Sequence, residues 1–234
     1  MDTASETRWE NLYKMAGIAA IVSEAVILLG IVTYFIWPYA PGNKSTESIL
    51  LLLKSNPLGG LISLDLFLFV GNLFSILLFL ALYVSLKPLN ESYALLALIV
   101  GLVGVVLLIP SRPLVELVSL SAQYAAATTE AAKAQYLATG DGLLTAFNGT
   151  GWFMNTLLGG ISLLVSSILM LRSRIYSKAT ALVGIITNSV VCGFFIPGLG
   201  TFLLFLSLPG YMIWYFLLAR KFFRLGNVSK NAGS

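Results

Sequence analysis

Residues 59–86 read GGLISLDLFLFVGNLFSILLFLALYVSL, and this stretch decides the fold class. It holds a single charged residue, Asp65. About 20 consecutive apolar residues are enough for a helix to cross roughly 30 Å of hydrocarbon, and this run exceeds that length. The stretch therefore predicts a membrane-spanning helix.

The rest of the chain repeats this pattern. Hydrophobic residues make up 58% of the 234 residues and charged residues 10%, whereas soluble domains have about 25% charged residues. The run at residues 15–39 ends in bulky side chains and is longer than the roughly 7–15 apolar residues of a signal peptide. We therefore expect it to stay in the protein as the first transmembrane helix. The sequence predicts an all-α membrane protein with six transmembrane helices in one integral membrane domain, residues 1–234, surrounded by the lipid bilayer. The six predicted spans are 15–39, 59–86, 93–110, 151–171, 179–196 and 201–218.

Between the third and fourth spans, residues 114–146 are rich in alanine and carry Glu130, Lys133 and Asp141. The segment has too few large apolar side chains to cross a membrane. We predict an external helix or hairpin here, with Gly140-Asp141-Gly142 as a turn. Such a segment could bind a protein partner.

Basic residues predict the orientation, because cytoplasmic loops retain an excess of lysine and arginine. Both ends of the chain and the second and fourth connections share one side, so the sequence predicts a multi-pass protein of the cell membrane with both termini in the cytoplasm. That side carries Arg8, Lys14, Lys87, Arg172, Arg174, Lys178, Arg220, Lys221, Arg224 and Lys230. The opposite side carries Lys44, Lys54, Arg112 and Lys133.

Several classes of chemistry are excluded by composition. The chain has no histidine and one cysteine, Cys192. Histidine zinc sites, histidine-ligated haem and Ser/His or Cys/His nucleophile pairs all need an imidazole. We therefore predict no catalytic residue, no metal site and no cofactor. The basic residues cluster at the ends of spans and form no stripe, so no nucleic-acid partner is predicted.

Three stretches are similar to one known family. ALYVSLKPLNESYALLA at 81–97 resembles a signature of a prokaryotic integral membrane family known as a domain of unknown function. MAGIAA at 15–20 and LPGYMIW at 208–214 are similar to its opening and closing patterns. The resemblance implies one multi-helix domain over nearly the whole chain, and it implies no activity. The family often carries a carboxylate in the third helix and another near the final proline, and this chain has neither at 101–108 nor at 210–212.

Polar side chains within the spans are candidates for function, because such groups are costly in hydrocarbon. Glu24 lies nine positions into the first span, about 13 Å along a helix, near the middle of the bilayer. Asn188 and Asn72 are expected at a similar depth. These three residues could form one polar cluster, serving either as hydrogen bonds between helices or as a path for a proton or small cation.

A second set of candidates lies at the outer ends of the second and third spans. Arg112 and Glu116 are spaced for an ion pair at i, i+4 if their helix continues past Pro113. Arg112 could pair with Asp65 instead. Either pair could clamp two helices or form part of a substrate site.

Three functional classes follow from these features. Small-solute or proton-linked transport is the working hypothesis. Because intramembrane charges are few, the expected cargo is a neutral solute, a proton or a small cation. A membrane assembly, sensory or partner-binding role is the alternative. An intramembrane enzyme is the least favoured, since no paired carboxylates are predicted. The oligomeric state is left open.

Overall fold

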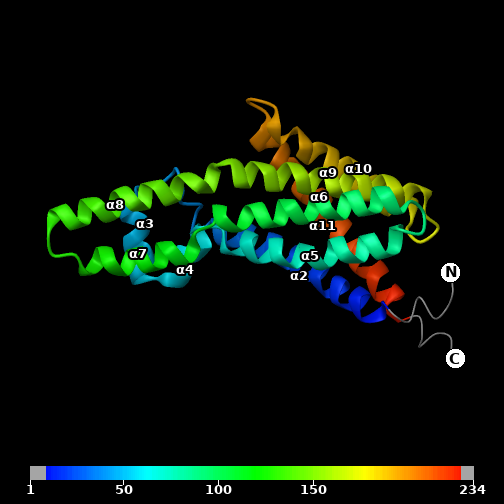
Figure 1. Cartoon of the computed structure of the whole chain (residues 1–234), viewed down its shortest axis with the longest axis horizontal. Helices are drawn as coiled ribbons and strands as arrows, with labels where there is room; N and C mark the ends of the chain where they lie inside the picture. The colour runs from blue at the N-terminus through cyan, green and yellow to red at the C-terminus, as the bar shows by residue number, and fades with distance from the viewer. Residues whose placement is uncertain (1–8, 228–234) are drawn as a thin grey trace.

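The computed structural model describes residues 9–227, which form helices joined by turns and contain no strand. Six helical stretches in this part are long and apolar enough to cross a membrane (Figure 1). The predicted all-α class with six transmembrane helices is therefore confirmed. The long helices are α2 (Glu10–Tyr34), α5 (Leu66–Leu86), α6 (Glu91–Leu108), α9 (Thr150–Arg172), α10 (Lys178–Cys192) and α11 (Gly200–Leu225). The shorter elements are α3 (Thr46–Ser55), α4 (Pro57–Ser63), α7 (Leu114–Ala126), α8 (Glu130–Thr145) and the 3₁₀ turns η1 (Ile109–Ser111), η2 (Ala146–Asn148) and η3 (Gly193–Phe195).

The structure differs from the prediction at the second span, which is not one helix over 59–86. The chain turns at Leu64 and Asp65, so that α4 lies before the break and α5 after it. Asp65 adopts a left-handed backbone conformation with φ of 63°. One residue in that conformation interrupts a right-handed helix however apolar its neighbours are, and an apolar run does not predict it.

The six long helices form a closed ring. Each packs against the next in the order α2, α5, α6, α9, α10 and α11, and α11 packs back against α2. The start of α2 and the end of α11 lie at one end of this bundle, here named the terminal end, while α3, α4, α7 and α8 lie beyond the other, the cap end (Figure 1). A ring of this kind encloses a space that side chains fill only in part.

Two separate hydrophobic cores hold the molecule together. The first lies in the terminal half of the bundle and contains Trp214, Leu218 and Phe222, none of which is accessible to solvent. The second hydrophobic core joins the short helices of the cap and includes Ile49, Leu117 and Phe147. Between the two cores the packing is looser: apart from Ser23 and Gly160, which lie next to their helix midpoints, α2, α5 and α9 bury residues only in their terminal halves.

The cap contains the predicted external segment, which forms the hairpin of α7 and α8 (Figure 1). The predicted turn at Gly140-Asp141-Gly142 was wrong, because these residues lie inside α8. Gly140 lets α3 approach closely: a Cβ there would be 2.5 Å from Cγ2 of Thr46. Thr46 also donates a hydrogen bond to Asp141. The glycine therefore serves packing between helices and not chain reversal.

Candidate functional site

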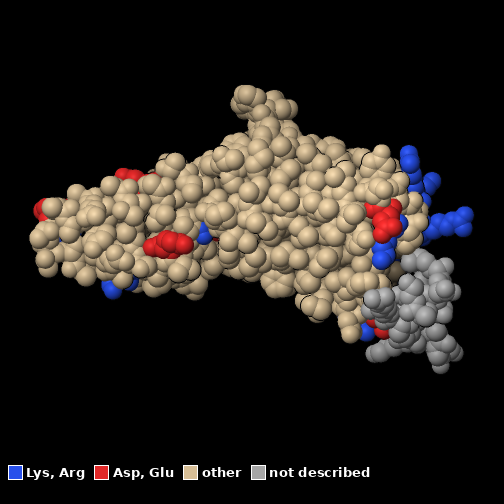
Figure 2. All heavy atoms as spheres, in the orientation of Figure 1, with Lys and Arg blue, Asp and Glu red and all other residues tan. Residues whose placement is uncertain are grey.

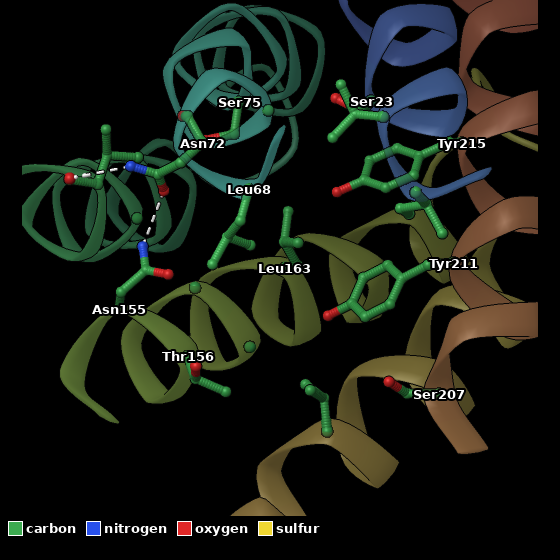
Figure 3. A pocket seen from close by; sticks show the side chains of 18 of the residues that line it. Ser23, Leu68, Asn72, Ser75, Asn155, Thr156, Leu163, Ser207, Tyr211 and Tyr215 are labelled. Carbon is green, nitrogen blue, oxygen red and sulfur yellow. Dashed lines mark hydrogen bonds between the residues drawn. The ribbon is translucent and has the colours of Figure 1, made fainter. Parts of the chain in front are cut away.

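A cavity of about 230 Å³ lies at the centre of the ring, and we name it the central chamber. All six long helices contribute to its wall, and no described residue that lines it is charged. In Figure 3, Tyr211 and Tyr215 of α11 point into this space from the side opposite Asn72 and Asn155. The polar side chains of the wall are Ser23, Asn72, Ser75, Asn155, Thr156, Ser207, Tyr211 and Tyr215.

Two amides tie three helices together at one side of the central chamber. Nδ2 of Asn155 on α9 donates to Oδ1 of Asn72 on α5 at 2.8 Å (Figure 3). The same nitrogen donates to the carbonyl of Gly104 on α6 at 3.0 Å. Nδ2 of Asn72 donates to the carbonyl of Val105 at 3.1 Å. Gly104 allows this approach, since a Cβ there would be 3.3 Å from the Asn155 carbonyl oxygen. These bonds position both amides at the wall of the chamber.

The opposite wall carries a second polar group. The Tyr211 hydroxyl donates to Oδ1 of Asn188 at 2.9 Å, and Nδ2 of Asn188 donates to the carbonyl of Gly184. Asn188 itself is fully buried and does not line the chamber. Ser23 of α2 lines it, and its buried hydroxyl has no hydrogen-bond partner in the described part of the chain. A buried hydroxyl without a partner costs folding free energy, and this oxygen is covered by its neighbours although Ser23 itself lines the chamber.

The three intramembrane candidates thus do not form one cluster. Asn72 belongs to the α5–α6–α9 network and Asn188 to a pair with Tyr211. Glu24 is half-buried and does not line the central chamber. It lies seven residues after Gly17, on the same helix face, and Gly17 faces Phe223 of α11. The carboxyl of Glu24 therefore lies on the stripe of α2 that faces α11.

At the cap end, Arg112 pairs with Asp65. Nη2 of Arg112 is 2.9 Å from Oδ2 of Asp65, and Nη1 donates to the Phe147 carbonyl at 2.8 Å. The guanidinium also lies over the rings of Phe147 and Trp152, at 4.9 and 5.2 Å from their centroids. Of the two alternatives that the sequence left open, the structure has the pair with Asp65, while Glu116 is exposed.

This ion pair joins the cap to the bundle. Asp65 precedes α5, Arg112 precedes α7, and Phe147 precedes α9. Nearby, the Tyr39 hydroxyl donates to Oδ1 of Asn148 at 2.9 Å. Burial and the negative charge of Asp65 raise the pKa of Tyr39 to about 12. Burial also raises the pKa of the Asp65 carboxyl above its ordinary value, although Arg112 opposes that shift.

A second cavity, of about 570 Å³, lies between the cap-end halves of α2, α5 and α11, and we name it the outer chamber. Val26, Ile27, Leu68 and Leu208 line both chambers, so the two adjoin. Asp65 lines the outer chamber, but Arg112 does not. In the described part of the chain, no group of three or more His, Cys, Asp or Glu side chains could hold a metal ion.

Sequence reasoning missed several residues of these chambers. Asn155 is a polar residue in an apolar span and shares a helix face with Gly159 and Gly160, a signal that was available. Ser23, Tyr211 and Trp37 gave no such signal, because serine and aromatic residues are common in membrane helices and at their ends. Their role depends on how neighbouring helices are arranged.

Comparison with known proteins agrees with the resemblance noted in the sequence. Neither the curated proteins nor the solved structures give a match to this chain. One family profile does match, over residues 12–220 and so over most of the chain, and it is described as a domain of unknown function. The predicted family membership is confirmed: the chain belongs to the DUF4386 family.

Proposed function

We propose that this protein binds a small uncharged solute in the central chamber and carries it across the membrane. The observation that carries the proposal is a cavity at the centre of a six-helix ring whose polar wall residues are all uncharged. Moving a charge into such a site would leave it without compensation. Hydroxyl and amide groups, in contrast, can replace the water around a neutral polar solute.

The size and chemistry of the central chamber narrow the class of solute. An apolar cavity of about 150 Å³ holds benzene, so about 230 Å³ accommodates a somewhat larger molecule. The amides of Asn72 and Asn155 and, opposite them, the hydroxyls of Tyr211 and Tyr215 supply donors and acceptors on two walls. These features favour a compact solute with an apolar body and one or two hydroxyl, carbonyl or amide groups.

Transport requires a second conformation, and the two halves of the bundle suggest how it forms. Large side chains close the terminal half, whereas the cap-end halves of α2 and α5 bury no residue except Ser23, next to the middle of α2. Pro209 lies inside α11 at the level of the central chamber. Proline removes a helical hydrogen bond and permits a kink. We propose that bending at Pro209 loosens the core of the terminal half and exposes the chamber to the other side.

The distribution of charge supports an orientation. Lysine and arginine gather at the terminal end, and the middle of the face in Figure 2 is almost free of charged side chains. Because positive residues are retained on the cytoplasmic side, we infer that both termini lie in the cytoplasm and that the cap lies outside the cell membrane.

Gly159 gives a direct test of the central chamber. It lies in the middle of the α9 face that lines the cavity, and an added Cβ would meet no atom within 4 Å. Gly159→Leu therefore fills the chamber without a clash at its first atom. Gly142→Leu is the matched control, because Gly142 of α8 is equally open and lies in the cap.

The measurement is swelling of proteoliposomes in glycerol, erythritol and 1,2-hexanediol. We expect wild type and Gly142→Leu to admit at least one of these solutes faster than protein-free vesicles, and Gly159→Leu to match the protein-free vesicles. Thermal melting in detergent checks that each variant is folded. Wild-type permeability equal to that of protein-free vesicles for all three solutes would overturn the proposal, as would full flux through Gly159→Leu.

A second candidate function is assembly with a protein partner through the α7–α8 hairpin. The observation in its favour is exposure: within α8 the only buried residue is Gly140, and Val115 of α7 is 80% exposed. A photoreactive amino acid at position 115 in intact cells tests this role. A discrete protein adduct supports assembly, and labelling of lipid or solvent alone counts against it.

A further inference from the structure

The outer chamber has a wall of different chemistry from the central one. Besides aliphatic residues, it is lined by six aromatic side chains, and Asp65 is the one charged residue among its described lining residues. At about 570 Å³ it is also more than twice as large. The six aromatic residues are Tyr34, Phe35, Trp37, Tyr39, Phe67 and Phe205.

Asp65 presents a negative charge to this chamber in spite of its ion pair. Arg112 contacts only one carboxylate oxygen, Oδ2, and the other oxygen has no hydrogen-bond partner in the described residues. The Asp65 side chain is 26% exposed and the Arg112 side chain 1%. The guanidinium is held behind the carboxylate by Phe147 and Trp152. A molecule in the outer chamber therefore meets the anionic side of the pair.

The backbone at Asp65 indicates that this carboxylate has a use beyond the turn. Its φ of 63° is a conformation in which glycine is the least strained residue. Strained residues of this kind persist where the surrounding structure holds them, and they gather at binding sites. A glycine would make the same turn with less strain, but it would supply no charge.

Aromatic walls and one carboxylate are the features that recognise an organic cation. The faces of tryptophan, tyrosine and phenylalanine attract ammonium groups, most strongly where water is excluded. We infer that the outer chamber is a binding site for an organic ammonium ion with an apolar body. This inference is independent of the solute proposed for the central chamber.

Other ligands fit the outer chamber less well. An anion would be repelled by Asp65, and Arg112 does not line the wall. Calcium and magnesium need about six oxygen ligands. The side-chain oxygens of the wall are the two of the Asp65 carboxylate and the hydroxyls of Thr33, Tyr34 and Tyr39, which are fewer than six even if all of them could converge. A purely apolar ligand would leave the exposed carboxylate oxygen without water or a partner.

A pair of matched probes separates charge from shape. Benzyltrimethylammonium and neopentylbenzene have the same outline, but only the first is charged. We expect calorimetry of the protein in nanodiscs, with empty nanodiscs subtracted, to give tighter binding of the ammonium probe. Asp65→Asn keeps the side-chain shape and tolerates the left-handed backbone, and we expect it to weaken ammonium binding about tenfold or more.

Gly30→Leu provides a second test that leaves the ion pair intact. Gly30 lines the outer chamber, and an added Cβ there would meet nothing within 4 Å. We expect Gly30→Leu to abolish binding of benzyltrimethylammonium, and Gly159→Leu and Gly142→Leu to leave it unchanged. This result would hold even if no solute crosses the central chamber, so the two proposals can fail separately. Equal affinity for both probes, or unchanged ammonium affinity in Gly30→Leu, would overturn the inference.

Discussion

The terminal half of the bundle is packed with large buried side chains, whereas the cap half holds the two chambers. Lipid is as apolar as leucine, so burial alone does not drive membrane helices together, and close packing and polar contacts must do so. The terminal half uses packing around Trp214, Leu218 and Phe222. The cap half uses the Asn72–Asn155 bond and the Asp65–Arg112 pair. Hydrogen bonds and ion pairs of this kind can hold helices together around a cavity, whereas close side-chain packing would fill the cavity.

The largest effect should come from the packed half. Trp214 is fully buried, its Nε1 donates to the Thr180 carbonyl at 3.1 Å, and its indole packs on Gly184. We expect Trp214→Ala to lower the free energy of unfolding by about 3–5 kcal/mol, measured by equilibrium denaturation in detergent micelles. Phe205→Ala on the same helix removes a ring that is 61% exposed at the outer chamber, and it should cost less than about 1 kcal/mol. Similar costs for the two variants would contradict the contrast between the halves.

The next effect concerns the clamp between cap and bundle. Arg112→Met would leave the Asp65 carboxylate largely desolvated without its cation, and removing one partner of a buried pair is strongly destabilising. Because Asp65 retains some exposure, we expect a loss of about 2–4 kcal/mol in the same denaturation experiment. The double variant Asp65→Asn/Arg112→Met removes both charges and should recover more than half of that loss. If the double variant is no more stable than Arg112→Met, charge pairing is not what joins the two parts.

The membrane-spanning helices were the easier part to predict from sequence. Spans such as 93–110 and 151–171 correspond closely to α6 and α9, because the length and apolarity of a run follow directly from the thickness of the bilayer. The broken second span shows the limit. The apolar run gives no signal for the break at Asp65, and its partner Arg112 lies far along the chain and comes near only after folding.

The chambers were hard to predict for a related reason. The polar residues Asn72 and Asn188 are visible in the sequence, but their partners are decided by which helices are neighbours in the ring. Aromatic residues near span ends, such as Trp37, match the general preference for membrane interfaces. Nothing in the sequence separates that preference from the wall of a cavity. A cavity has no sequence signature of its own, because its position depends on where the packed helices leave a gap between their side chains.

A smaller effect should appear in the pH dependence of ammonium binding. The outer chamber needs the ionised Asp65 carboxylate to bind an ammonium ion, so the affinity should fall as the pH decreases. Burial raises the pKa of Asp65, and the fall should therefore begin at a higher pH than it would for an exposed aspartate. Below that pKa the loss approaches about tenfold per pH unit, as for any single protonation. The nearby hydroxyl of Tyr39 stays neutral over this range because its pKa is raised to about 12. Calorimetry across pH 4–8 is the measurement, and Asp65→Asn should abolish the dependence.

The smallest effect is expected at Glu24, although it is the most conspicuous polar residue of the sequence. Its neighbour Ser23 lines the central chamber, whereas Glu24 lines neither chamber and faces the α11 side of α2. We expect Glu24→Gln to change the free energy of unfolding by less than about 0.5 kcal/mol and to leave solute flux unchanged, while Ser23→Ala alters flux. Proton-dependent flux that disappears in folded Glu24→Gln would contradict this expectation. The carboxyl of Glu24 would then belong to the transport path, and the interface between α2 and α11 would have to open together with the central chamber.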